Sequence, residues 1–307
     1  MKFLKQQIDT FLTTNITESV PEYDPETNYT FESGDPTNDS LARVGSYIYR
    51  SLVTDNLDNH PEENLNTKWV KWDASNAYSM LDMKSNTKTT LNDDIIVTFD
   101  WARDDDTIVV GNYAAERIRV EVLNALDEVL WTYDTPNTIN DAVTDYWSYI
   151  YAGYDFEINR ATMIKVPGTL DPVKCRVTIF QHITEPAECG FLVGGNAFNM
   201  GCTLMDVSFN FNSFATKEFD AFGTANIVKR AIQDISDFET LIDSFEIPTM
   251  KRKIKEIYDD VVVFIVDDRE ESKYENMITL GTVQDASVIH SNLNKSTITW
   301  SVVEVVS

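Results

Sequence analysis

The residue types that most often carry out catalysis are few in this chain and are scattered along it. The three histidines are His60, His182 and His290, and none lies near a cysteine or serine in a nucleophile motif. The sequence contains no G-x-S-x-G, H-E-x-x-H or P-loop pattern. A glycan depolymerase would need two carboxylates about 5 to 9.5 Å apart in a cleft, and no pair stands out among the 50 acidic residues. We therefore expect no enzymatic activity and no cofactor.

Two further sets of residues have side chains that bind metals. The aspartate run 104–106 follows a predicted strand, and adjacent carboxylates can bind Ca²⁺ from a loop. Adjacent side chains point in different directions, however, so a solvated turn is the favoured interpretation. Cys175, Cys189 and Cys202 are 14 and 13 residues apart, which fits neither a zinc site nor a disulfide framework. We expect three reduced cysteines in the core and no metal site.

Aromatic and amide side chains gather between residues 47 and 78, where they could bind a carbohydrate. A pyranose has an apolar C–H face and polar edges, so its site combines aromatic rings with hydrogen-bonding groups. The alternative is that these rings form the core of a small module with few aliphatic residues. The candidate ligand-binding residues are Tyr49, Asn56, Asn59, Trp69 and Trp72.

Part of this stretch resembles a short motif of carbohydrate-binding modules in bacterial chitinases and many phage tail proteins. The usual motif is Y-x-S-L-V-x-x-N-x-G-N-x-P followed by W. The matching residues are Tyr49-Arg50-Ser51-Leu52-Val53, Asn56, Asn59-His60-Pro61 and Trp69. Asp58 stands where the motif has glycine.

A second resemblance covers Trp69 to Thr89, with a T-K-T-T stretch near its end. The chain reads W-V-K-W-D-A-S-N-A-Y-S-M-L-D, similar to the segment W-x-x-x-G-P-S-N-R-W-A-M-F-D of virion proteins from tailed phages and prophages. Asp73-Ala74 replace Gly-Pro, and Ala77-Tyr78 replace Arg-Trp. Shorter similarities follow at 189–195, 200–203, 219–230 and 261–304.

The resemblance implies a structural protein of the tail, baseplate or neck of a phage particle, acting through protein–protein contacts. The expected partners are other copies of the chain and other virion proteins, and the expected location is the virion. A carbohydrate-binding adhesin that contacts host glycans is the alternative, and one protein can have both roles. The family implies no catalytic residues.

The net charge limits which partners the chain can bind. Fifty acidic and 25 basic residues give a formal charge of −25, which repels nucleic-acid phosphates and anionic membrane surfaces. No run of 18 apolar residues occurs, so membrane insertion is not expected. Residues 1–7 lack the apolar stretch of a secretory signal, so we expect synthesis in the host bacterial cytoplasm.

The middle of the chain has the residue pattern of short strands, with apolar and polar residues alternating. The expected strands are 93–101, 116–123 with 128–133 as its hairpin partner, 173–183 and 203–211. They predict a mainly β fold, with an antiparallel β-sandwich or jelly roll over 93–215. Gly194-Gly195 is interpreted as a hairpin turn. The residues expected to point inward are Ile118, Val120, Val177, Ile179, Val207 and Phe209.

The N-terminal region is predicted to form two parts. Apolar residues at helical spacing predict an amphipathic helix over residues 1–19, and a proline-bearing extended arm follows up to residue 40. Because residues 1–40 have little local core, we expect them to pack on another subunit. Residues 41–92 form the small aromatic-rich module, which begins with a strand at 44–53.

The C-terminal region, 216–307, is predicted to be an α+β unit. A helix is expected at 248–258, with a proline in its first turn. The expected strands are 261–266 and 296–306. In 225–245 the spacing of apolar residues favours a helix, whereas the resemblance implies two strands, which we adopt.

Overall fold

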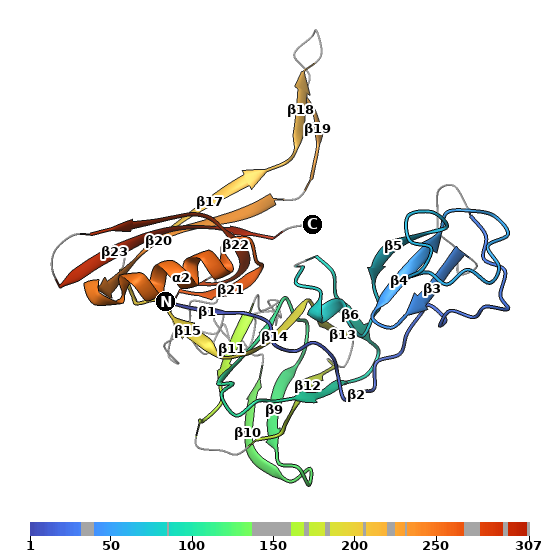
Figure 1. The fold of residues 1–307 in the computed structure, drawn as a ribbon, viewed down its shortest axis with the longest axis horizontal. Helices are drawn as coiled ribbons and strands as arrows, with labels where there is room; N and C mark the ends of the chain where they lie inside the picture. Colours follow the sequence, from blue (N-terminus) through green and yellow to red (C-terminus); the bar gives the residue numbers. More distant parts are fainter. Residues whose placement is uncertain are drawn as a thin grey trace, which may run out of the picture.

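The chain is built mainly of β-strands, as the sequence predicted. The computed structural model describes residues 1–31, 40–84, 86–136, 161–168, 172–181, 185–204, 207–219, 225–230, 232–266, 277–290 and 294–305. Figure 1 shows a C-terminal sheet with the helix α2, central sheets below it, a small sheet of β3, β4 and β5 at the right, and a hairpin that projects at the top.

Two antiparallel sheets in the middle of the chain share one hydrophobic core, which we call the central core. The first sheet has the order β10 (Val129–Pro136), β9 (Arg117–Leu123), β12 (Lys174–Phe180), β7 (Ile95–Asp100) and β2 (Thr13–Thr14). The second has the order β11 (Ala161–Lys165), β8 (Thr107–Gly111) and β14 (Phe191–Gly195). The predicted hairpin of β9 and β10 is confirmed. Four of the predicted inward residues are fully buried, namely Ile118, Val120, Val177 and Ile179.

The other two predicted inward residues do not belong to the central core. Val207 packs against the C-terminal core, and Phe209 is 41% exposed. Residues 208–213 form β17 (Ser208–Ser213), which pairs with a strand of the C-terminal sheet. The prediction was wrong because alternation identifies an apolar face but does not identify what covers it.

The C-terminal sheet has eight strands and takes four of them from outside residues 216–307. Its order is β15 (Ala197–Asn199), β1 (Lys2–Leu4), β21 (Val262–Ile265), β22 (Ile278–Ile289), β23 (Lys295–Glu304), β20 (Ile232–Asp243) and β16 (Cys202–Thr203), with β17 also paired to β20. The predicted helix is present as α2 (Ile247–Ile257), and Pro248 lies in its first turn. Its buried residues join Phe238 and Trp300 in one core, so α2 covers one face of this sheet.

Residues 225–245 contain two strands, β19 (Ala225–Val228) and β20, and not the helix that periodicity favoured. The core-facing positions of β20 alternate, but two of the buried ones are the polar residues Ser236 and Thr240. Thr240 Oγ1 accepts a hydrogen bond of 2.9 Å from Trp300 Nε1. With these two positions polar, the apolar residues that remain imitate helical spacing.

The predicted N-terminal helix is wrong. Residues 2–4 are the strand β1, which lies between β15 and β21 and pairs with both. Leu4 is fully buried near Val263, whereas Ile8 is buried in the central core. The segment is extended because its apolar residues enter different cores. Of the predicted arm, residues 32–39 lie outside the described residues.

Gly194-Gly195 does not form the predicted hairpin turn, because both residues are part of β14 and pair with β8. A Cβ at Gly194 would lie 2.9 Å from Ile8 and 3.0 Å from Trp101. Glycine is needed here because the N-terminal segment passes close to the strand.

Two leucines of the N-terminal segment test this packing. Leu4→Ala should lower the free energy of unfolding by about 2–5 kcal/mol, because the substitution leaves a cavity in a closed core. Leu12 is 46% exposed, and Leu12→Ala should change it by less than about 0.5 kcal/mol. Urea unfolding of both variants measures the difference. Equal effects would show that the N-terminus does not pack as described.

Candidate functional site

The aromatic-rich module is a three-stranded antiparallel sheet in the order β3, β4, β5. The strands are β3 (Leu41–Val44), β4 (Tyr47–Ser51) and β5 (Trp69–Ala74). Gly45, with φ +57°, lies in the tight turn between β3 and β4. Successive side chains of a strand point to opposite faces, so the predicted site residues are divided between two faces.

Trp69 is at the centre of the buried face. Its side chain has no exposed surface, and its Nε1 donates a hydrogen bond of 2.7 Å to the carbonyl oxygen of Asn59. Tyr29 and Tyr23 pack edge-on against the indole, with ring centroids 5.0 and 6.1 Å away. Tyr49 is buried in the same cluster. Neither Trp69 nor Tyr49 therefore offers a ring face on which a sugar could stack.

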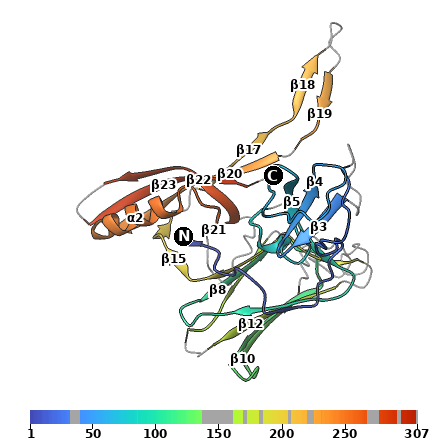
Figure 2. The ribbon, with the colours of Figure 1, turned by 45° about the vertical axis from the view of Figure 1, so that its right-hand side comes forward.

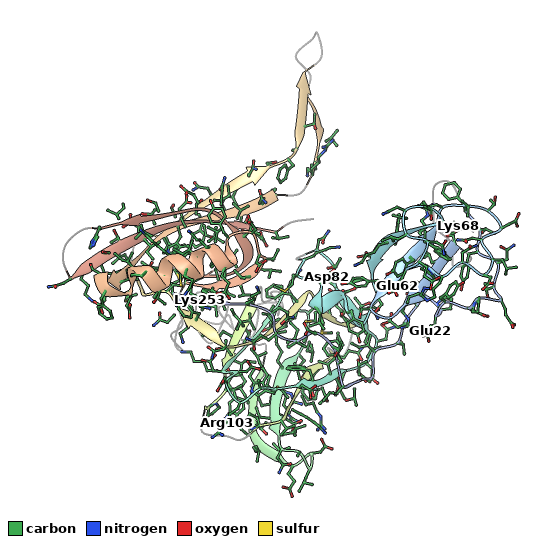
Figure 3. The ribbon with its side chains drawn as sticks, in the orientation of Figure 1. Glu22, Glu62, Lys68, Asp82, Arg103 and Lys253 are labelled. Carbon is green, nitrogen blue, oxygen red and sulfur yellow. The ribbon has the colours of Figure 1, made fainter. Side chains whose placement is uncertain are left out.

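The two predicted amide ligands hold the loop between β4 and β5. Asn56 is 1% exposed, and its Nδ2 donates to Ser51 Oγ at 3.0 Å. Asn59 Nδ2 donates to Asn56 Oδ1 at 3.0 Å, and Lys68 Nζ donates to Asn59 Oδ1 at 2.5 Å. Figure 3 labels Lys68 in this module. These hydrogen bonds are intramolecular and fix the loop that encloses Trp69.

Trp72 is on the other face of the sheet and is 49% exposed. Arg50 Cζ lies 4.9 Å from the centroid of its ring and 5.9 Å from that of Phe31, which is 39% exposed. Lys71 Nζ lies 3.1 Å from the ring centroid of Tyr47, which is 40% exposed. Aromatic rings beside cations can stack on a sugar and bind its polar groups. Lys71 pairs with Tyr49, and Tyr47 is two residues from Tyr49 in β4, so this second pair lies on the opposite side of the sheet from Arg50. We call Phe31, Arg50 and Trp72 the outer face.

Sequence reasoning selected Trp72 but missed the rest of the outer face. Arg50 lies between Tyr49 and Ser51, both of which are buried, so alternation directs it to the opposite side. It pairs with Val70, and the register then shifts so that residue 72 of β5 has no partner in β4. The contact of Arg50 with the Trp72 ring shows that their side chains lie on one face. The alternation was visible in the sequence, but the burial of Tyr49 was not.

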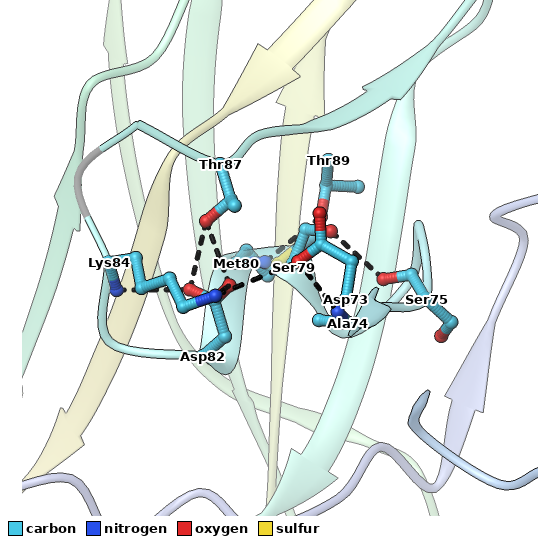
Figure 4. Close-up of polar contacts among 9 residues, drawn as sticks. All are labelled: Asp73, Ala74, Ser75, Ser79, Met80, Asp82, Lys84, Thr87 and Thr89. Carbon is cyan, nitrogen blue, oxygen red and sulfur yellow. Dashed lines mark hydrogen bonds and ion pairs between the residues drawn. The ribbon is translucent and has the colours of Figure 1, made fainter. Parts of the chain in front are cut away.

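The residues of the second resemblance form the junction between the module and the central sheets. Ser79 Oγ donates to the Ser75 carbonyl at 3.0 Å, and Thr89 Oγ1 accepts from Met80 N at 3.1 Å (Figure 4). Asn76 Nδ2 donates to the carbonyls of Thr17 and Thr90. The shared residues Ser75, Asn76 and Met80 thus have structural contacts.

Asp82 is the most enclosed carboxylate of this junction, with its side chain 7% exposed. It accepts from Thr87 Oγ1 at 2.8 Å, and Lys84 Nζ lies 3.9 Å away (Figure 4). Burial raises the pKa of Asp82, and the hydrogen bond from Thr87 opposes this rise only in part. These contacts tie Asp82 to Lys84 and Thr87, so the enclosure of this carboxylate is explained by a structural role.

The aspartate run lies in the turn between β7 and β8, as predicted, but it is not fully solvated. Asp105 is 8% exposed and accepts from the backbone N of Ala102 at 3.0 Å, and burial raises the pKa of its carboxyl group. Asp106 Oδ1 accepts from the backbone N of Ala197 at 2.9 Å. Within the described residues, no group of three or more ligating side chains could hold a metal ion.

The cysteines are free, as predicted, but they are not all in the core. Cys175 and Cys189 are buried, whereas Cys202 is exposed. Burial raises the pKa of both core thiols, that of Cys189 to about 12. Of the three histidines, His182 lies outside the described residues, and His60 packs edge-on against Tyr23.

No protein-family model, curated protein or solved structure matches the chain. The resemblance to phage virion proteins therefore depends on the residues named above. Nowhere in the described part of the chain is there a helix with the length and apolar character of a membrane span.

The two tryptophans of the module should differ strongly in their effect on stability. Trp69→Ala removes a buried ring and should lower the free energy of unfolding by about 3–5 kcal/mol. Trp72→Ala removes an exposed ring and a cation–π contact, which together stabilise by about 1 kcal/mol or less. Urea unfolding monitored by near-UV circular dichroism compares them. A larger loss for Trp72→Ala would reverse the assignment of the two faces.

Proposed function

We propose that the chain is a structural, non-enzymatic subunit of a tailed-phage virion, in the tail, baseplate or neck. It acts through contacts with other copies and other virion proteins. The observation that carries this proposal is the projecting hairpin formed by β17, β18 (Thr216–Phe219), β19 and the start of β20. We call the described residues of this hairpin, 208–219, 225–230 and 232, the arm, which is distinct from the extended N-terminal arm predicted for residues 20–40.

The arm extends away from the rest of the molecule in both views (Figures 1 and 2). Its outer strands pair only with each other in the sheet topology. An isolated two-stranded hairpin is marginally stable in water, so a second surface is needed to hold it. Exposed apolar side chains in a cluster mark such an interaction surface. Those of the arm are Phe209, Phe211, Phe214, Val228 and Ile232, between 41% and 70% exposed.

The backbone at Asp58 adds support from the first resemblance. This residue stands where the motif has glycine, and its φ is +55°, in the left-handed region that glycine adopts most easily. Aspartate tolerates this conformation better than most residues. We also propose that the two central sheets are layers of an antiparallel β-sandwich, because both bury side chains in the same core.

The composition of purified particles tests the virion assignment. Mass spectrometry of gradient-purified particles from a lysate of the encoding cells should find this chain in constant ratio to the other structural proteins. A variant in which a short glycine-serine turn replaces residues 209–231 should be made at normal levels but be missing from particles. If the wild-type chain stays in the soluble fraction of the lysate, the virion assignment is wrong.

The alternative function is that of an adhesin for host glycans, and the outer face favours it. Trp72 presents an exposed ring, and Arg50, whose Cζ lies 4.9 Å from the ring centroid, supplies hydrogen-bond donors beside it. A single shallow site of this kind has about millimolar affinity, so adhesion requires many copies acting together.

A glycan array tests the adhesin role. Wild-type protein displayed in many copies should bind a subset of glycans, and Trp72→Ala should abolish that binding. Phe245→Ala is the matched control, because Phe245 is an exposed ring, 79% accessible, outside the outer face. Binding that survives Trp72→Ala would place the site elsewhere, and loss in both variants would reflect a general change in surface properties.

A further inference from the structure

We propose that the arm docks on a second copy of this chain, against the loop between β9 and β10, so that copies join head to tail. This inference rests on the assembly role proposed above and identifies the partner and the contact. We call residues 124–130 the receiving loop.

The apolar side of the arm continues the core face of the C-terminal sheet. Phe238 and Ser236 are buried on the core face of β20, and Asp234 and Ile232 follow on the same face toward the arm. Phe209 pairs with Ser236, and Phe211 pairs with Asp234. Both phenylalanines therefore lie on the same side as the core face of β20, past the part of the sheet that α2 covers, and Asp234 is the one charged residue among these positions of β20.

The sequence of the arm is unusually rich in phenylalanine. Five of the 16 phenylalanines of the chain lie within residues 208–232. The three whose side chains are described, Phe209, Phe211 and Phe214, are all exposed, as expected for a contact surface rich in aromatic residues.

The receiving loop presents a second exposed apolar cluster. Leu126 is 78% exposed, Val129 is 49% exposed and Leu130 is 40% exposed. The loop is fixed by Asn124, whose Oδ1 accepts from the backbone N of Leu126 at 2.9 Å and from that of Glu128 at 3.0 Å. Leu126 is therefore held at the surface by a preformed turn.

The charges of the two surfaces are complementary. The sequence of residues 208–232 contains three basic and two acidic residues, a net charge of +1 in a chain whose total is −25, and Lys229 and Arg230 are exposed. The receiving loop contains two carboxylates and no basic residue. Asp127 is already paired with Lys174, whose Nζ lies 2.7 Å from Asp127 Oδ1, so the carboxylate that remains for a basic residue of the arm is that of Glu128. Contact of arm with loop is thus favoured over contact of arm with arm, in which like charges would meet.

The two surfaces lie at opposite ends of the molecule. Figures 1 and 2 differ by a rotation about the vertical axis, and both place β18 and β19 at the top and β10 at the bottom. A contact between opposite ends joins different surfaces of the two partners. Such a contact repeats from copy to copy, giving a ring if it closes and a filament if it does not.

Mixing two assembly-deficient variants of the full chain tests the head-to-tail contact. Phe211→Asp disables the arm, and Leu126→Asp disables the receiving loop. Analytical ultracentrifugation should find each variant monomeric at concentrations where the wild type forms larger species. Their mixture should form one-to-one dimers and nothing larger, because each partner keeps one functional end. Phe245→Asp places the same charge on an exposed ring beyond the other end of β20, and this control should assemble like the wild type.

A charge exchange tests the electrostatic part of the contact. Arg230→Glu and Glu128→Lys should each weaken association by at least about tenfold. The double variant should return to within about threefold of the wild type, because the opposite charges meet again. Circular dichroism and thermal unfolding of every variant verify that the fold is retained.

Three outcomes would overturn the inference. They are a wild type that stays monomeric at all concentrations, a Leu126→Asp variant that assembles normally, and a mixture that forms no dimers. None of these results would contradict the presence of the chain in purified particles, which is measured separately. Failure of self-association and failure of the virion assignment are therefore distinguishable.

Discussion

The insertion of β1 between β15 and β21 is the contact on which the rest of the structure depends. Residues 2–4 pair with 197–199 on one side and with 263–265 on the other. A single residue, Asn196, separates β15 from β14 of the central sheets, and Leu4 contacts a core that contains residues of both regions. The C-terminal sheet is therefore complete only when both ends of the chain are present. Pairings between such distant residues form slowly, because a long loop must close first.

Local patterns predicted the elements whose surroundings are simple. The hairpin of β9 and β10 alternates strictly, and α2 has one apolar stripe that packs on one sheet. The N-terminal segment was wrongly predicted to be a helix, and in β20 the apolar spacing favoured a helix although two strands were adopted there. Leu4 and Ile8 have helical spacing, yet they enter two separate cores, and β20 turns two polar residues inward. In both cases contacts with distant residues decide the structure, and spacing along the chain does not report them.

The candidate site, too, was predicted in part from local patterns and depends in part on contacts with distant residues. A spacing of three residues in a strand indicates that Trp69 and Trp72 differ in exposure. Which one is covered depends on Tyr23 and Tyr29, which pack on Trp69 from a segment about 40 residues earlier. The aromatic composition of the module was evident from the sequence. Its separation into a buried cluster and an outer face with Arg50 and Trp72 required the strand register, including the irregularity beside Tyr49.

The length of β20 has a mechanical consequence. Its 12 residues run from the base of the arm into the C-terminal sheet, paired with β17 near the arm and with β23 over most of their length. A pull on the arm along this strand loads the backbone hydrogen bonds of the ladder in shear, so that many of them resist together. The tension then passes through the sheet to β1 and from there to the central sheets. A force applied to the arm is therefore distributed over the C-terminal sheet and the central sheets.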